Sequence, residues 1–314
     1  MPTTHRRALL QIHICVVLWG FTAILGKLIS LAALPLVWWR MVLVAALLLL
    51  VPAFWRGLPA MQRSLLATYA GIGTFVALHW LTFYGSVKLS NASVAATCMA
   101  LTPVFTAFVE PMLARRRIDP VEVLFGLAVI PGVAMVTGGT PTQMRLGILV
   151  GTLSAFFVAI FGSLNKRYIG SSPVLTVTGI EIGAGAAFLA LFGSVLSPST
   201  SVFVLPGWQD ALLLIALAVG CTLLPFALSL VALRRLSAFS ASLAVNLEPV
   251  YAIVLAIVLL GEQRELAPTF YLGVLIILAV VFSHPLWVSR GKRAQGEAAS
   301  VAAGADRHDR DTIG

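Results

Sequence analysis

The feature that most constrains this chain is a succession of apolar stretches, each long enough to cross a lipid bilayer. A helix of ~20 apolar residues rises ~30 Å, which is the thickness of the hydrocarbon core. Short connections marked by proline or by basic residues separate these stretches. Ten of them can be placed, at residues 8–31, 34–55, 64–87, 92–114, 120–137, 146–168, 173–196, 208–233, 238–260 and 268–288. The sequence therefore predicts an all-α integral membrane protein with ten transmembrane helices.

Composition excludes the soluble classes of protein. The chain is 59% hydrophobic and only 11% charged, which is far from the usage of soluble domains. Its net charge of +9 comes from short basic clusters between apolar stretches, so it indicates membrane orientation and not a nucleic-acid partner. The three cysteines lie singly inside apolar stretches, and no enzyme or metal-site motif is present. We therefore expect no catalytic residue, no metal and no cofactor.

The basic clusters also predict how the chain is oriented. Arg115-Arg116-Arg117 and Arg234-Arg235 fall on the same side of the predicted membrane as both termini, whereas isolated residues such as Lys88 and Arg264 fall on the other side. Because cytoplasmic connections are enriched in lysine and arginine, both termini are predicted to be cytoplasmic.

An internal repeat divides the chain into two halves. Pro103-Val104-Phe105 aligns with Pro249-Val250-Tyr251 about 146 positions later, and each proline interrupts an apolar stretch. If each half has five helices, an odd number, the second half enters the membrane upside down relative to the first. We expect inverted five-helix repeats at residues 1–141 and 142–289. The polar remainder, 290–314, is expected to be a disordered cytoplasmic tail.

Several short motifs give the chain a family resemblance over residues 8–288. They are Leu18-Trp19-Gly20-Phe21, Pro35 with Arg40, Thr102-Pro103-Val104-Phe105, Leu247-Glu248-Pro249-Val250 and Leu260-Gly261-Glu262. In this order they resemble the EamA type of the drug/metabolite transporter (DMT) superfamily. The resemblance implies a ten-helix permease of the bacterial inner membrane, with alternating access around a central cavity. Arg115-Arg116 stands where the family's first half has Gly-Glu, and Glu110-Pro111 is an addition.

Glu248 is the first candidate for a functional residue. It lies about ten residues from either end of its apolar stretch, roughly 15 Å deep, where a charge costs on the order of 3 kcal/mol. Pro249 beside it removes a backbone donor. We expect Glu248 to bind a cation or ammonium group or to carry a proton. The alternative is a fixed bond to a neighbouring helix, for instance to Arg40.

Further candidates come from polar and aromatic residues in other apolar stretches. Glu181, between Gly179 and Gly183, either lines the cavity or serves helix packing. His79 is either a proton relay or a satisfied interior histidine. The remaining residues predicted to bind substrate are Trp19, Tyr84 and Tyr251. Structural or gating contacts are predicted for Pro103, Pro249, Glu110 (with Arg115), Arg40 and Asn246, the last as an interhelical hydrogen bond.

These observations together predict a secondary transporter that exports a small metabolite, in the first place an amino acid or a related compound. Its partners are then a small-molecule substrate and the lipid bilayer, with coupling to protons or to the cargo gradient; the pattern also allows a homodimer. The alternative is a lipid-flipping or intramembrane lipid-modifying protein.

Overall fold

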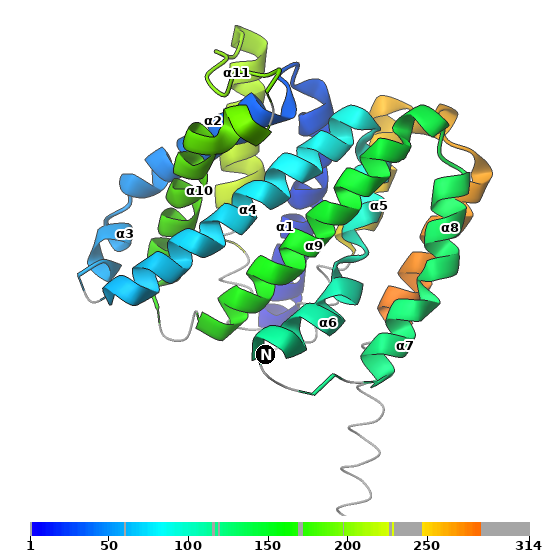
Figure 1. The fold of residues 1–314 in the computed structure, drawn as a ribbon, viewed down its shortest axis with the longest axis horizontal. Helices are drawn as coiled ribbons and strands as arrows, with labels where there is room; N and C mark the ends of the chain where they lie inside the picture. The colour runs from blue at the N-terminus through cyan, green and yellow to red at the C-terminus, as the bar shows by residue number, and fades with distance from the viewer. Residues whose placement is uncertain are drawn as a thin grey trace, which may run out of the picture.

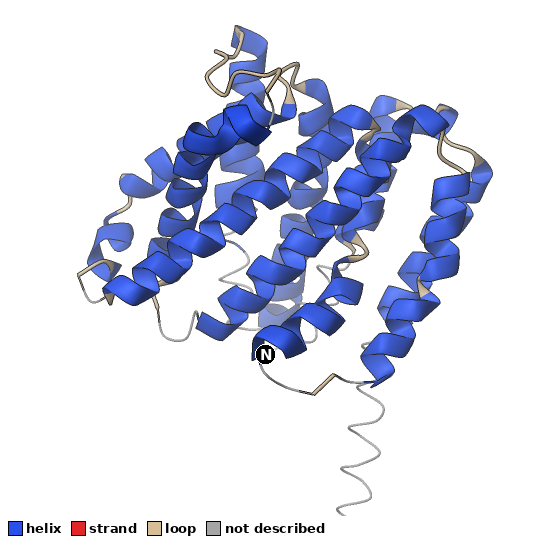
Figure 2. Ribbon diagram, viewed as in Figure 1, coloured by secondary structure: helices blue, strands red, loops and turns tan. Residues whose placement is uncertain are grey.

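The computed structural model describes residues 2–59, 61–114, 117–118, 120–168, 172–196, 198–225, 228 and 247–283. Within these ranges all regular secondary structure is helical, and no strand occurs (Figure 2). The helices run back and forth between two ends of one bundle (Figure 1). We call the end at which the chain begins the N-terminal end, and the other the opposite end. The predicted tail, 290–314, lies outside the described residues.

Ten apolar helices follow one another in the described part of the chain. Five are long enough to cross a membrane: Leu10–Leu28, Arg63–Leu89, Ala92–Leu113, Thr142–Asn165 and Val174–Gly193. Five are shorter: Ala33–Leu49, Val123–Gly138, Trp208–Leu223, Glu248–Leu260 and Pro268–Ser283. Their order follows the ten apolar stretches of the sequence.

The first half begins with α1 (Pro2–Leu28) and α2 (Ala33–Leu49). The prediction of one helix over 34–55 is wrong, because α2 ends at Leu49 and a separate short helix, α3 (Pro52–Gly57), follows. Pro52 explains the break, since it lacks the N–H of a continuing helix but suits the first position of a new one. The chain then returns through α4 (Arg63–Leu89).

The predicted interruption at the first repeated proline is present. The stretch 92–114 forms α5 (Ala92–Met99) and α6 (Thr102–Ala114), so Pro103 is the second residue of a new helix. The stretch 120–137, predicted as one helix, is also divided, into α7 (Pro120–Ala128) and α8 (Ile130–Gly138). Pro131 is again the second residue of the helix that follows the break.

The second half starts with a 3₁₀ turn, η1 (Thr142–Met144), that leads into α9 (Arg145–Tyr168) and then α10 (Val174–Leu196). Next come α11 (Trp208–Ile215) and the π-helical η2 (Ala216–Leu223), which form the described part of the predicted span 208–233. Of the predicted span 238–260, the structure describes α14 (Glu248–Leu255) and the π-helical η3 (Ala256–Leu260). The short η4 (Glu262–Arg264) and the helix Pro268–Ser283 complete it.

The helices of the two halves are interleaved. α4 packs along α9 and α10, α1 packs along α14, and α2 packs along α10. Glycines permit the closest approaches: a Cβ at Gly73 of α4 would lie 2.1 Å from the backbone oxygen of Glu181 on α10. Outward-facing leucines such as Leu149 and Leu191 remain exposed, as expected of a surface that meets lipid.

Hydrogen bonds tie the helices together at the opposite end. Both carboxylate oxygens of Glu262 accept backbone N–H groups at the start of α5, from Ala92 at 2.9 Å and Ser93 at 2.8 Å. Asp210 accepts the backbone N–H of Ser30 at 2.8 Å and its hydroxyl at 2.6 Å. Further bonds join Lys27 to the Ser90 carbonyl, Lys88 to the Ile29 carbonyl and Asn91 to Glu265. These bonds join segments far apart in the sequence and hold this end of the bundle together.

Candidate functional site

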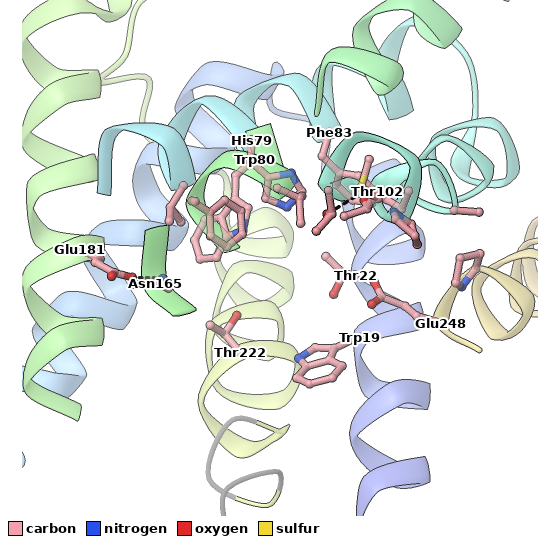
Figure 3. Close-up of a pocket in the computed structure, with 18 of the residues that line it drawn as sticks. Trp19, Thr22, His79, Trp80, Phe83, Thr102, Asn165, Glu181, Thr222 and Glu248 are labelled. Carbon is pink, nitrogen blue, oxygen red and sulfur yellow. Dashed lines mark hydrogen bonds between the residues drawn. The ribbon is translucent and has the colours of Figure 1, made fainter. Parts of the chain in front are cut away.

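A cavity of about 920 Å³ lies between the helices of the two halves. Its walls are mostly apolar, with valines and aromatic rings, and a few polar groups point into it (Figure 3). The polar and aromatic lining residues on which the argument rests are Trp19, Thr22, Arg40, His79, Trp80, Thr102, Glu110, Asn165, Glu181, Thr222 and Glu248. Apolar walls with a few converging polar groups are typical of small-molecule sites.

Glu248 stands at the start of a helix inside this cavity. It is the first residue of α14, and Pro249 is the second; both line the cavity. The first N–H groups of a helix have no intrahelical partner and carry partial positive charge, which favours a carboxylate at this position. The interrupted helix thus presents an acid to the cavity from a favourable position.

Arg40 is the basic group of the cavity, and neighbouring side chains hold it. Its Nη1 donates to the Tyr84 hydroxyl at 2.8 Å, while Nε and Nη2 both donate to the Thr222 hydroxyl, at 3.3 and 2.9 Å. The guanidinium also lies over the ring of Trp80, 3.8 Å from its centroid. These described neighbours hold Arg40, and no ion pair within 4.0 Å joins it to Glu248, the fixed bond considered as an alternative. Glu248 is therefore not locked to Arg40 in this conformation.

His79 makes a reciprocal pair of bonds with Ser154. The Ser154 hydroxyl donates to the His79 backbone carbonyl at 2.9 Å and lies 2.8 Å from Nδ1 of the ring. Because the hydroxyl has one proton and gives it to the carbonyl, Nδ1 must be the donor in the second bond. The ring therefore carries its proton on Nδ1 and leaves Nε2 as the acceptor nitrogen. Its ring centroid lies 5.6 Å from that of Phe161.

Glu181 and Asn165 form a second polar group on the cavity wall. The Asn165 amide donates to Oε2 of Glu181 at 3.3 Å. Both residues line the cavity, as does Thr178 one turn earlier on α10. Figure 3 shows this pair well apart from Glu248. Of the acids that line the cavity, Glu181 and Glu248 therefore have different surroundings.

The structure brings most of the candidates from the sequence to the cavity wall, but not all of them. Trp19, Pro103 and Glu110 line it. Tyr84 is fully buried and supports Arg40, and Tyr251 bonds to Nδ1 of His13 at 3.2 Å; neither lies on the cavity wall. Asn246, predicted to make an interhelical hydrogen bond, and Arg115, predicted to pair with Glu110, lie outside the described residues.

Sequence reasoning missed three polar residues of the cavity wall. Asn165 and Thr222 hold Glu181 and Arg40, and Thr22 lies one turn after Trp19 on α1. The signal available for Asn165 was an amide inside an apolar stretch, the same signal that singled out Asn246. Threonines are common in membrane helices, so Thr22 and Thr222 carry no such signal.

Comparison with known proteins identifies relatives among transporters. The EamA-like transporter family matches residues 6–138 and again residues 145–284. The Bacillus subtilis protein named uncharacterized transporter YxxF is 26% identical over 253 residues, covering 78% of this chain and 76% of its own length. The Pseudomonas aeruginosa protein named uncharacterized transporter PA0485 is 24% identical over 285 residues, covering 87% of this chain and 92% of its own. None of these names favours lipid flipping or lipid modification.

A solved structure shares the fold. One crystal structure covers 91% of this chain and 98% of its own chain at 19% identity, with a TM-score of 0.57. The apolar helices, the cavity between them and the double family match lead to the same conclusion. The chain is a membrane protein that belongs to the EamA-like transporter family.

Proposed function

We propose that the protein is a secondary transporter that moves a small metabolite, in the first place an amino acid or a related compound, by alternating access. The observation that carries this proposal is the cavity of about 920 Å³, lined by both halves of the chain and containing both Glu248 and Arg40. Ligand pockets usually measure about 300–1,000 Å³, so a molecule of this class fits inside. Energy comes from a proton gradient or from the gradient of the cargo.

The charges of the cavity suit a cargo with an ammonium and a carboxylate group. Glu248 offers a carboxylate to the ammonium group. Thr222 and Tyr84 engage three of the five N–H groups of Arg40, so the planar guanidinium keeps donors for a carboxylate while its orientation is fixed. Trp19 and Trp80 supply apolar surface beside these charges.

The arrangement of the helices supports two inverted five-helix repeats, 1–141 and 142–289. In such repeats α9 is the counterpart of α1, α10 of α2, and α14 of the interrupted helix α5–α6. α1 packs against α14, and correspondingly α9 packs against α5 and α6. α2 packs against its own counterpart α10, and α5 packs against its counterpart α14. Exchanging the two halves therefore leaves each of these contacts unchanged. The double family match supports the same division. Inverted repeats place a substrate between the halves.

The orientation belongs to the same proposal. The basic clusters of the sequence support an orientation with both termini in the cytoplasm of a bacterium and the bundle in its inner membrane. The N-terminal end of the bundle is then the cytoplasmic end.

Removal of the Glu248 charge tests this function. Metabolites are profiled in cells that overproduce the protein or its Glu248→Gln and Glu248→Ala variants, and the compound that leaves the cytoplasm is then measured as flux in proteoliposomes. We expect one compound to be depleted by the unmodified protein, and both variants to lose at least about tenfold of its flux, a change equal to about 1.4 kcal/mol.

The matched control is Glu265→Gln, an exposed acid outside the cavity that accepts one bond from Asn91 and can still do so as an amide. Its flux should equal that of the unmodified protein. Normal flux in both Glu248 variants would refute the proposal.

A further inference from the structure

The pair of Glu181 and Asn165 has acceptor oxygens for which the described residues supply no hydrogen-bond partner. Glu181 is only 7% exposed, although it lines the cavity. Its Oε2 accepts the single bond from Asn165, whereas its Oε1 and the Asn165 Oδ1 have no hydrogen-bond partner among the described residues. An ionised carboxylate with one long amide bond is costly in such surroundings. Two acceptor oxygens at one place, both without a partner among the described residues, are suited to a positively charged species.

Tight packing fixes the backbone of this acid. A Cβ at Gly73 would lie 2.1 Å from the Glu181 carbonyl oxygen, and one at Gly185 would lie 2.7 Å from the Gly73 carbonyl oxygen. α4 and α10 therefore touch back to back at this level, and the main chain of Glu181 cannot turn away. The acid is held at the cavity wall by the fold, as a functional group would be.

Other described charged groups do not provide a partner for these oxygens. Among the described side chains, the charged or titratable groups that line the same cavity, or that lie on α2, α3, α4 or α9, are Arg40, Arg56, Arg63, Tyr69, His79, Tyr84, Lys88, Glu110, Arg145, Arg167, Tyr168, Cys221 and Glu248. No basic side chain in the described ranges comes within 4.0 Å of the Glu181 carboxylate. Arg40 is held by Thr222 and Tyr84, and His79 by Ser154. Since none of the described side chains supplies the positive species, solution is the source that remains for it.

We propose that Glu181 and Asn165 form the proton-binding site through which the transporter is coupled to the proton gradient, separate from the substrate contacts at Glu248 and Arg40. A proton from the aqueous phase binds one carboxylate oxygen and converts the carboxylate into a neutral acid. The Asn165 amide serves both states, since its NH₂ donates to the carboxylate and, after a half-turn, its oxygen accepts from the acid O–H. This inference rests on the proposed transport function.

A proton fits this site better than a metal cation. Hard metal cations take about six or more oxygen ligands. The described residues offer two unpartnered oxygens here, and no group of three or more His, Cys, Asp or Glu that could hold a metal occurs in the described ranges. One acid and one amide suffice for a proton.

Infrared difference spectroscopy tests the site without any cargo. The purified full-length protein in liposomes is stepped between about pH 9 and about pH 5, and the carbonyl band of newly protonated carboxylic acids is recorded. We expect Glu181→Gln to remove one such band and Glu248→Gln to leave that band in place. Histidine titration does not contribute to this spectral region.

Asn165→Ala provides a second measurement that retains the acid. Because the variant removes the hydrogen bond to Glu181, the band should remain but shift in frequency. Size-exclusion chromatography checks that Glu181→Gln is folded; if it is not, the shift in Asn165→Ala decides the matter.

The proposal fails if folded Glu181→Gln keeps every carbonyl band, or if Asn165→Ala leaves them all unshifted. It also fails if added sodium at constant pH, and not acid, changes the signal of Glu181. These outcomes are separate from those of the transport assay. If Glu181→Gln removes a band but no compound shows flux, the proton site is supported and the transport function is contradicted. If a compound shows flux but no band belongs to Glu181, the transport function is supported and the proton site is contradicted.

Discussion

At the scale of single residues, the structure explains how an arginine is tolerated inside an apolar bundle. Arg40 is only 4% exposed, yet two hydroxyl groups and an aromatic ring compensate its burial. The guanidinium is planar and has several donors at fixed angles, so it can bond to both hydroxyls and stack on the ring at the same time, which a lysine ammonium cannot do. The side chain therefore serves as a rigid positive surface in the cavity wall.

Arg40→Lys should show that shape matters as well as charge. The variant keeps the charge but cannot reach Tyr84 and Thr222 together, so the free energy of unfolding should fall by about 2 kcal/mol. Thermal unfolding of the detergent-purified protein measures the change. Arg264→Lys, at an exposed position of η4, should unfold like the unmodified chain. Equal unfolding of all three proteins would contradict this reading of Arg40.

The sequence could indicate which acids deserve attention but not which partners they have. Glu248 was predictable because a charge in the middle of an apolar stretch is costly. The partner of Glu262 was not predictable, because its carboxylate accepts backbone N–H groups in the first turn of α5, about 170 positions earlier in the chain. Such a contact depends on the packing of two halves and leaves no local pattern. Asn165 is intermediate, visible as a polar residue but without a visible partner.

At the scale of elements, proline determines where the helices of this bundle begin. Pro103, Pro131 and Pro249 each occupy the second position of a helix, and Pro52 the first. In the sequence, Pro103 and Pro249 predict interrupted helices, whereas the helices predicted at 34–55 and 120–137 continue across Pro52 and Pro131. Hydropathy is continuous across those two prolines, so the apolar pattern alone concealed the breaks.

Helix contact at Gly73 gives a prediction with a control on the same helix. In Gly73→Ala the new methyl group would collide with the backbone of α10, so the free energy of unfolding should fall by about 1–3 kcal/mol. A Cβ at Gly71, also on α4, meets nothing within 4 Å, and Gly71→Ala should be neutral or stabilising by up to about 1 kcal/mol. Thermal unfolding of both variants measures the difference. Equal shifts would mean that α4 and α10 do not touch at Gly73.

At the scale of the whole molecule, the carboxylates that join helices at the opposite end and the cavity lie at different levels of the bundle. Glu262, Asp210 and their partners join helices at the opposite end. The cavity extends toward the N-terminal end of the bundle, where it is lined by Glu110 in the last turns of α6 and by Val174 at the start of α10. In the alternating access that we propose, the two ends of the bundle would open in turn. The number and order of apolar helices were predictable from hydropathy, whereas this distribution of contacts required the packed structure.

The central claim, a cavity that opens in turn to both sides of the membrane, is tested most directly by cysteine accessibility. Thr102→Cys places a thiol on the cavity wall of a chain whose buried native cysteines, Cys15, Cys98 and Cys221, are replaced by alanine. Leu149→Cys, on the outward-facing surface, is the control that a membrane-impermeant aqueous reagent should not label. Our account predicts that the reagent labels Thr102→Cys when applied from either face of the membrane. Labelling from one face only, in a protein that still transports its cargo, would contradict it.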